Sequence, residues 1–393
     1  MGDWFNLIAS AALIANLSGS GLAIGGLFLA RLLPPFVLTP LVGVVADRFD
    51  RRKILIVSDL LRIGVVLAFL LVRTEADIWL LYALTILQLS ISAFFEPTRA
   101  ALLPGLVARQ DLVTANALAG TTWSTMLALG AALGGLATAL FGITAAFLID
   151  AATFAISAWF VSRIRVSAAA VEPDSPVDRD TGWQAFRAGL NYLWQRPAVL
   201  IIALVKASAA LAFGGMAVVE VTFAKEIFPI GADGSGTLGL IYFAVGLGTG
   251  LGPLLARRIT GDEPIAMQWA ILFTYLVMIL GYTLMGWSST LALLLIATLI
   301  RTSGSGTIWV YSSSLLQMIV PDRFLGRVFA FDFAMMTLAA SVSTLWVGWA
   351  KDTLGLGPYQ IVLMLGAIPL IMAIGWTLYL TLHVKRQQAL PQL

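Results

Sequence analysis

Long apolar segments separated by short polar connections occupy most of the chain. A helix needs about 20 apolar residues to cross a bilayer, and the pattern predicts an all-α membrane protein with twelve transmembrane helices. The predicted spans are 4–17, 22–46, 54–72, 78–98, 112–140, 142–162, 198–224, 237–256, 265–286, 290–314, 327–350 and 358–382. The first span is short, and we expect that the chain begins late and that this helix is truncated.

The composition agrees with a lipid environment. Of the 393 residues, 59% are hydrophobic and 11% are charged, whereas soluble domains carry roughly 25% charged residues. The chain contains no cysteine, and its one histidine is His383. These counts exclude disulfides, thiol catalysis and multi-histidine metal sites. We therefore expect no metal and no other cofactor.

The distribution of Lys and Arg predicts the orientation. If the N-terminus is cytoplasmic, 17 of the 24 basic residues lie in cytoplasmic segments, three in outer loops and four within spans. Cytoplasmic loops of membrane proteins are enriched in Lys and Arg. The pattern predicts a multi-pass membrane protein with both termini in the cytoplasm, and the location that we expect is the plasma (inner) membrane of a bacterium.

A polar linker divides the predicted spans into two sets of six. The expected parts are an N-terminal half (1–162), a linker (163–197), a C-terminal half (198–382) and a cytoplasmic tail (383–393). Within the linker, 182–196 has the pattern of an amphipathic interfacial helix. A motif that begins at Gly43 recurs in weaker form from Gly252. The two halves are therefore interpreted as pseudo-repeats, which typically move about a shared substrate site.

The connection after the second span carries a specific motif, Gly43-Val-Val-Ala-Asp47-Arg48-Phe-Asp50-Arg51-Arg52-Lys53. It resembles the loop signature G-x-x-x-D-R-x-x-R-R of the major facilitator superfamily. The resemblance implies that family's fold and a cytoplasmic gate, which stabilises the outward-open state. Asp50 departs from the glycine that is common at its position.

The chemistry of this motif suits a gate. Gly43 permits close approach of another helix, and Asp47 can lie at the positive N-terminus of the eleventh span. Arg48 and Arg51 can reach carboxylates, with Asp332 as a candidate partner. The predicted gate residues are Gly43, Asp47, Arg48, Arg51, Arg52 and Asp332.

A second resemblance narrows the branch of the superfamily. Phe94-Phe95-Glu96-Pro97-Thr98-Arg99-Ala100-Ala101-Leu102-Leu103-Pro104 is similar to a segment of macrolide-efflux and enterobactin-exporter proteins. In that branch a Gly-Asp pair falls inside the first span, where this chain has Gly2-Asp3. One departure is that the small-residue motif at 129–135 contains no proline, although exporters of the superfamily usually have one there.

Polar and ionisable groups within spans are costly in lipid, so they are usually functional or paired. The candidate substrate or proton site residues are Asp3, Asn6, Arg31, Asp150, Lys206, Glu220 and Arg301. Proton coupling requires a carboxylate that gains and loses a proton, for which Asp3, Asp150 and Glu220 are candidates. The alternative is structural ion pairing, such as Asp150 with Arg31. Asp59 and Arg62, three residues apart, are interpreted as a local pair.

Aromatic side chains suit an amphipathic substrate. The candidates for a cavity lining are Trp123, Phe154, Phe213, Phe243 and Trp309; the alternative is that they pack or face lipid.

These features favour a secondary transporter, not an enzyme. We expect proton-coupled efflux of amphipathic small molecules (drug, macrolide or siderophore-like) by alternating access, with the proton gradient as energy source. No nucleotide-binding loop of the form G-x-x-x-x-G-K-[ST] is present in the sequence. The expected partners are the substrate and membrane lipids, without nucleic acid, and the chain is expected to act as a monomer. The alternatives are a lysophospholipid, lipid or siderophore carrier and a transport-inactive membrane scaffold.

Overall fold

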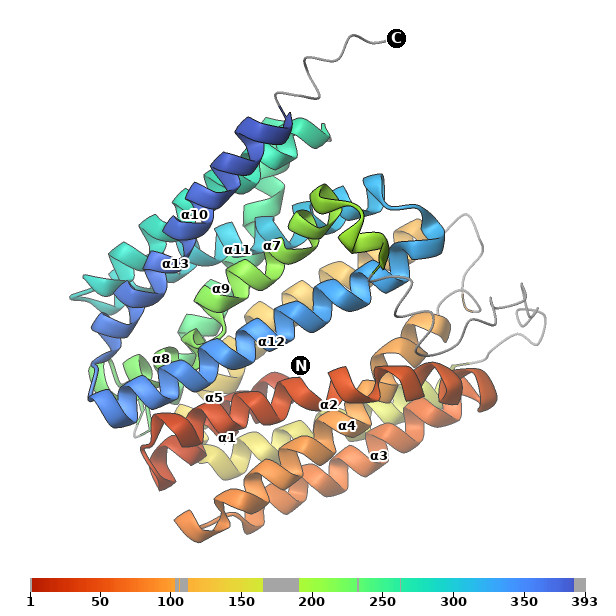
Figure 1. Cartoon of the computed structure of the whole chain (residues 1–393). Coiled ribbons are helices and arrows are strands. Elements are labelled where there is room, and N and C mark those ends of the chain that lie inside the picture. The colour runs from red at the N-terminus through yellow and green to blue at the C-terminus, as the bar shows by residue number, and fades with distance from the viewer. Residues whose placement is uncertain are drawn as a thin grey trace. The chain divides into compact units, whose positions relative to one another are not determined.

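The computed structural model describes residues 2–102, 106, 112–164, 191–231, 233–261 and 263–384. All regular structure within these ranges is helical (Figure 1). The elements in chain order are α1 (Gly2–Leu17), α2 (Gly21–Arg48), α3 (Arg51–Ala68), η1 (Phe69–Leu71), η2 (Glu75–Asp77), α4 (Ile78–Leu102), α5 (Leu112–Arg163), α7 (Pro197–Phe213), α8 (Met216–Thr222), η6 (Phe223–Ile227), α9 (Ser235–Thr260), α10 (Pro264–Gly286), α11 (Leu291–Ile319), α12 (Asp322–Leu354), α13 (Pro358–Tyr379) and η7 (Leu380–Val384).

The all-α membrane fold predicted from the apolar segments is confirmed. Within the described ranges, nine helices are long and apolar enough to cross a membrane, and the apolar stretch Gly21–Pro34 is shorter. α5 contains two of the predicted spans and is interrupted at Gly142, where φ is +83° and ψ is 169°. Only glycine adopts this backbone conformation at little cost, so Gly142 marks the boundary expected between residues 140 and 142.

Local sequence explains where several helices begin. Proline occupies the start of α7, α10 and α13, where its missing N–H costs nothing because the first amides of a helix have no intrahelical partner. α11 begins after Thr290, whose hydroxyl accepts a hydrogen bond from the Leu293 amide at 3.2 Å. These helices therefore begin at residues that favour a helix start, close to the ends of the spans predicted from the apolar pattern.

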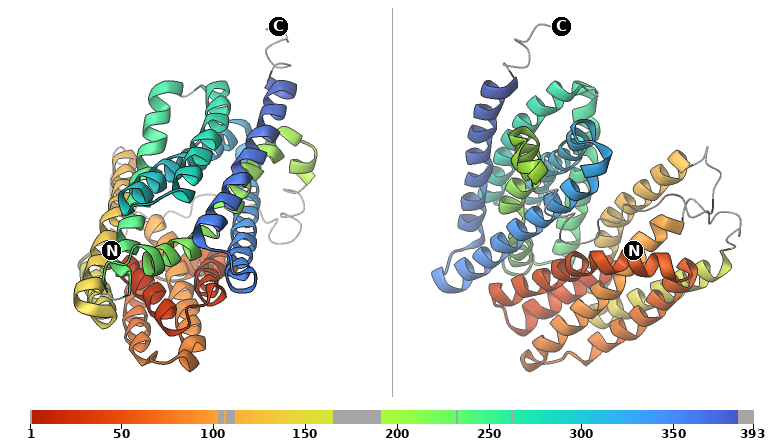
Figure 2. Two further views of the ribbon diagram at one scale, coloured as in Figure 1. Left: turned by 90° about the vertical axis from the view of Figure 1, so that its left-hand side faces the viewer. Right: turned by 45° about the vertical axis from the view of Figure 1, so that its right-hand side comes forward.

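Contacts between Cα atoms divide the chain into two compact units. Unit 1 contains the described residues of Met1–Ser175 and of Glu220–Phe243, and unit 2 contains those of Pro176–Val219 and of Ala244–Leu393. In unit 1, α1 packs against α5, α2 against α4, and α3 against both α4 and α5. The red and orange helices in Figures 1 and 2 belong to this group.

A segment from the second half of the sequence completes unit 1. The Lys225 ammonium donates a hydrogen bond to the Ala15 carbonyl, near the C-terminal end of α1, where the helix dipole favours a cation. Gly239 of α9 faces Gly135 of α5, and a Cβ atom added to Gly135 would lie 2.6 Å from the Gly239 Cα. Two glycines therefore allow these helix backbones to touch.

Unit 2 is built around α7, α10 and α11. α7 packs against α11, α12 and α13, and α10 packs against α11 and α13. The indole N–H of Trp376 on α13 donates to the Gln268 carbonyl of α10 at 2.8 Å. Most of the predicted linker and its amphipathic helix (182–196), together with nearly all of the tail (383–393), lie outside the described residues.

Candidate functional site

A buried ion pair joins α7 to α12 in unit 2. Nζ of Lys206 lies 2.5 Å from Oδ2 of Asp332, and the side chains are 5% and 2% exposed. Close packing against α12 continues at the turn that follows α7. There the Gly215 amide donates to the Ser343 hydroxyl at 3.0 Å, and the Thr344 hydroxyl donates to the Gly214 carbonyl at 2.9 Å.

Small residues at this crossing fix the register of the two helices. A Cβ atom on Gly214 would lie 2.5 Å from the Cα of Ala340. Lys206 and Asp332 each precede this contact by eight residues, about 12 Å at 1.5 Å per residue. The two helices therefore run in the same direction here, and the close contact places Lys206 opposite Asp332.

The ion pair lines a cavity of about 280 Å³. The other lining residues are Trp309, Ser313, Phe329, Phe333 and Met336. Lys206 Nζ lies 5.0 Å from the Trp309 ring centroid and 5.4 Å from that of Phe329, within the range of cation–π attraction. Oδ1 of Asp332 is buried and accepts no hydrogen bond. The cavity thus combines one cation, one anion with an unpaired oxygen, and aromatic walls.

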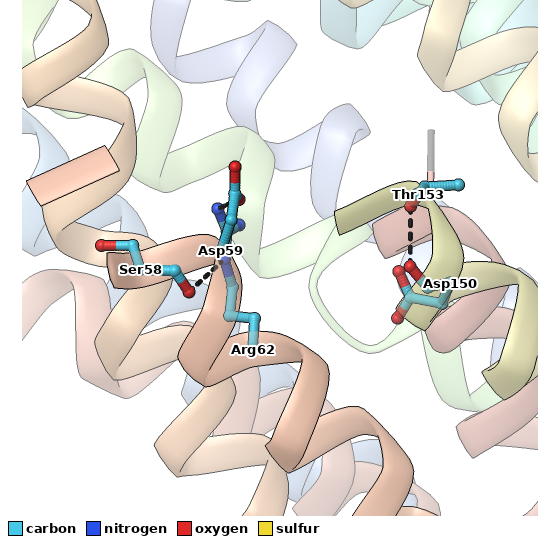
Figure 3. A network of polar contacts seen from close by, with 5 residues as sticks. All are labelled: Ser58, Asp59, Arg62, Asp150 and Thr153. Atoms are coloured by element: carbon cyan, nitrogen blue, oxygen red, sulfur yellow. Dashed lines mark hydrogen bonds and ion pairs between the residues drawn. The ribbon is translucent and has the colours of Figure 1, made fainter. Parts of the chain in front are cut away.

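A second group of charges lies in unit 1, around Asp150 of α5. This side chain is fully buried, and neither carboxylate oxygen has a hydrogen-bond partner. Figure 3 shows the Thr153 hydroxyl bonded to the main-chain carbonyl of Asp150, at 2.8 Å, instead of to its carboxylate. Asp150 interacts through space with Asp3, Arg62 and Arg31. We name Asp3, Arg31 and Asp150 the carboxylate cluster.

Arg62 of α3 lies beside this cluster and is held on several sides. Its guanidinium contacts Asp59 at 2.5 Å, so the local pair expected from the sequence is present (Figure 3). Its Cζ atom lies 4.4 Å from the Phe95 ring centroid and 4.3 Å from that of Phe154. The planar guanidinium of arginine has a flat surface that can face aromatic rings, which the ammonium of lysine lacks. The sequence pattern gave no signal for this aromatic sandwich.

The seven candidate substrate or proton site residues are divided between the two units. The structure brings Asp3, Arg31 and Asp150 together in unit 1 and places Lys206 in the cavity of unit 2. Arg31 and Asp150 interact through space, but Asp150 accepts no hydrogen bond from Arg31. Of the five aromatic candidates, only Trp309 lines this cavity; the side chain of Trp123 is not described.

The other three candidates are buried. Asn6 of α1 is buried and accepts a hydrogen bond from Ser10 at 3.4 Å. Arg301 of α11 is buried, and its guanidinium lies 5.5 Å from the Tyr282 ring centroid. Glu220 of α8 is buried within the segment that joins unit 1. Neither Arg301 nor Glu220 lines the cavity of unit 2.

The predicted gate motif spans the end of α2 and the start of α3. The side chains of Gly43, Asp47 and Arg48 lie outside the described set. The Asp50 carboxylate accepts a hydrogen bond from the Lys53 amide at 3.1 Å. This N-cap explains why an aspartate suits the position, because it satisfies one of the free amides at the start of α3.

Two other gate residues have partners that the motif does not predict. The Arg52 guanidinium donates to the carbonyls of Val161 and Ser162, at the C-terminal end of α5, where a cation compensates the helix dipole. Asp332 pairs with Lys206, a different cation from the predicted Arg48 or Arg51. The gate role of Asp332 stays a prediction.

Comparisons with known proteins agree with the motif resemblance. A family model described as Major Facilitator Superfamily matches residues 1–344. The chain is 27% identical to the "Uncharacterized MFS-type transporter YfiS" of Bacillus subtilis (strain 168), over 94% of this chain and 89% of that protein. It is 24% identical to the "Multidrug efflux pump Tap" of Mycolicibacterium fortuitum, over 90% of this chain and 87% of that protein.

Two more similarities concern the predicted branch and the fold. The chain is 26% identical to the "Macrolide efflux protein A" of Streptococcus pyogenes, over 42% of this chain and 43% of that protein. Among solved structures, a mutant form of the nucleoside transporter NupG superposes with a TM-score of 0.75, at 13% identity, over 96% of this chain and 95% of that one. The predicted fold and the resemblance to efflux proteins are confirmed.

Proposed function

Because the chain belongs to the Major Facilitator Superfamily and is a transporter, we propose that it exports amphipathic small molecules in exchange for protons, by alternating access. The observation that carries the proton coupling is Asp150, a fully buried carboxylate without a hydrogen-bond partner on either oxygen. A carboxylate in this state has no fixed donor to hold it ionised, so its charge depends on nearby groups. Such a group is suited to gain and lose a proton during transport.

The neighbours of Asp150 supply the means of coupling. With Asp150 ionised, the cluster holds two carboxylates and the Arg31 guanidinium, with Arg62 beside it. A proton on Asp150 removes one negative charge and leaves the arginines less compensated. Two unit charges about 6 Å apart interact by about 3 kcal/mol at an effective dielectric constant of about 20. A change of that size alters a conformational equilibrium about a hundredfold.

The direction of transport is proposed from the similarity to efflux proteins. In this proposal the protein lies in the inner membrane of a bacterium with both termini in the cytoplasm, because 17 basic residues then lie on that side. The motif from Gly43 to Lys53 then faces the cytoplasm and acts as the gate. The protein works as a monomer among lipids and needs no cofactor beyond the proton gradient.

An efflux panel tests this proposal against its alternatives. The chain is expressed in a bacterial host without its own multidrug pumps, and cells are loaded with amphipathic dyes, a macrolide and a lysophospholipid. We expect energy-dependent export of at least one dye or drug, abolished by a proton uncoupler. Export of only the lysophospholipid favours the lipid carrier. Failure to export any compound, with the protein present in the membrane, favours the scaffold and contradicts the proposal.

A further inference from the structure

We propose that the cavity between α7 and α12 binds small zwitterions with an apolar body, such as aromatic amino acids and short apolar peptides. This inference rests on the proposed function, because it names the substrate class that the transporter recognises in unit 2. It is carried by the Lys206–Asp332 pair, the unpaired Asp332 oxygen and the aromatic walls.

Charge balance inside the cavity selects the ligand. The protein supplies one buried ammonium and one buried carboxylate, and removal of the partner from a buried charge is strongly unfavourable. With the Lys206–Asp332 pair intact, a ligand with only an anionic group would add an uncompensated negative charge to the cavity. A ligand with only a cationic group would add an uncompensated positive charge. A zwitterion adds one charge of each sign, one beside Lys206 and one beside Asp332, and the cavity stays neutral.

The unpaired oxygen of Asp332 indicates where the ligand's ammonium binds. Oδ2 accepts the Lys206 ammonium, whereas Oδ1 is buried and accepts no hydrogen bond. Buried polar atoms nearly always have a hydrogen-bond partner, so Oδ1 is an acceptor that a ligand can satisfy. Lys206 has three ammonium hydrogens and donates one of them to Asp332, which leaves donors for a ligand carboxylate.

The walls of the cavity indicate the rest of the ligand. Trp309 and Phe333 line the cavity and remain 46% and 40% exposed, so their rings can cover an apolar group. Phe329 and Met336 add further apolar surface, and Ser313 adds one hydroxyl. The volume of about 280 Å³ falls just below the range of about 300–1,000 Å³ typical of small-molecule sites. The ligand is therefore small.

Calorimetric titration of the purified full-length chain in lipid nanodiscs at pH 6.5 tests the inference. The probes are phenylalanine, alanyl-phenylalanine, its N-acetyl form, its C-terminal amide and the doubly blocked form. At this pH the free peptide amine is mostly protonated and the carboxylate is ionised. We expect saturable binding of alanyl-phenylalanine and at least tenfold weaker binding of each blocked form. Binding of neither zwitterion, or equal affinity for all forms of the peptide, overturns the inference.

Two charge variants give a result that does not depend on the stability of each variant, because the affinities of the different ligands are compared on one and the same protein. Asp332→Asn removes the negative charge that would pair with the ligand's ammonium. This variant should therefore bind the N-acetyl form at least as tightly as the zwitterion. Lys206→Met should instead prefer the C-terminal amide. The matched controls Lys351→Met and Asp352→Asn, near the end of α12, should keep the wild-type order. If the Lys206 and Asp332 variants also keep that order, the pair does not recognise the ligand and the inference is overturned.

The outcome separates this inference from the proposed function. If neither zwitterion binds while uncoupler-sensitive export of dyes persists, the ligand class is wrong and the exporter proposal stands. If zwitterions bind with the expected charge preference but no compound moves across the membrane, the cavity is a binding site and the exporter proposal falls.

Discussion

Lys206 on α7 and Asp332 on α12 form a buried ion pair, with 2.5 Å between Nζ and Oδ2. The two residues are 126 positions apart in the sequence and lie opposite each other because small residues bring the helices together at Gly214 and Ala340. Their mutual attraction replaces the water that each charge loses on burial. The pair should therefore contribute to stability as a unit.

Removal of one partner of this pair should destabilise the protein more than removal of both. We expect Lys206→Met or Asp332→Asn alone to cost about 3–5 kcal/mol, because each leaves a buried charge unpaired. The double variant should cost less than either single one. Thermal unfolding in detergent, followed by tryptophan fluorescence, measures the three variants, and additive losses would show that the two charges are not coupled.

Asp150→Asn should separate transport from the proton gradient. Asparagine keeps the size of the side chain but cannot ionise, so the charge of the carboxylate cluster becomes fixed. We expect substrate to move down its own gradient at a rate that no longer depends on an imposed pH difference. Asp352→Asn, at an exposed position, is the control and should retain the dependence. A gradient response in Asp150→Asn would exclude Asp150 as the coupling residue.

Arg62→Lys should destabilise unit 1 although it conserves the charge. Lysine cannot stack a planar group between Phe95 and Phe154, as Arg62 does. The loss should be about 1–3 kcal/mol. Arg163→Lys is a suitable comparison, because Arg163 is exposed and lies over a single ring, that of Trp159. Equal melting temperatures for the two variants would argue that the sandwich adds no stability.

Gly135→Ala should impair folding of unit 1, because the new Cβ atom would lie 2.6 Å from the Gly239 Cα. Relief of this overlap requires a helix backbone to shift, which typically costs about 1–3 kcal/mol. Gly64→Ala is the matched helical control, since its Cβ atom would meet nothing within 4 Å. Alanine favours the helix there by about 1 kcal/mol. A melting temperature unchanged by Gly135→Ala would show that the two helices do not need this contact.

Arg52→Ala should weaken the end of α5, since Arg52 donates to the Val161 and Ser162 carbonyls. The expected loss is about 0.5–2 kcal/mol. Lys53→Ala serves as the control, because the Lys53 side chain is exposed and its amide, which Asp50 caps, is retained. If both variants unfold at the same temperature, the arginine does not act as a helix cap.

The apolar pattern predicted the helices well because the bilayer imposes one length and one composition on every span. The boundary between residues 140 and 142 was found because the break at Gly142 coincides with a change in that pattern. The local pair of Asp59 and Arg62 was predictable because three residues bring side chains onto one helix face. In each case the information lies within one short segment.

The partner of Asp332 could not be predicted in the same way. Its contact with Lys206 depends on the crossing at Gly214 and Ala340. This crossing cannot be predicted from any short segment of the sequence. The aromatic sandwich around Arg62 likewise joins three separate helices. The seven polar candidates were chosen one by one from their positions in apolar segments, whereas their division between two units is a property of the tertiary packing.

The most direct test of the proton-exchange account uses proteoliposomes that contain a pH-sensitive dye in the lumen. Wild-type protein is reconstituted, a pH difference is imposed, and a compound identified by the efflux panel is added on one side. We predict that the substrate moves against its concentration gradient while the pH difference dissipates, and that Asp150→Asn loses both of these activities. Substrate movement by the wild-type protein at the same rate with and without the pH difference, and without proton flux, would contradict the account.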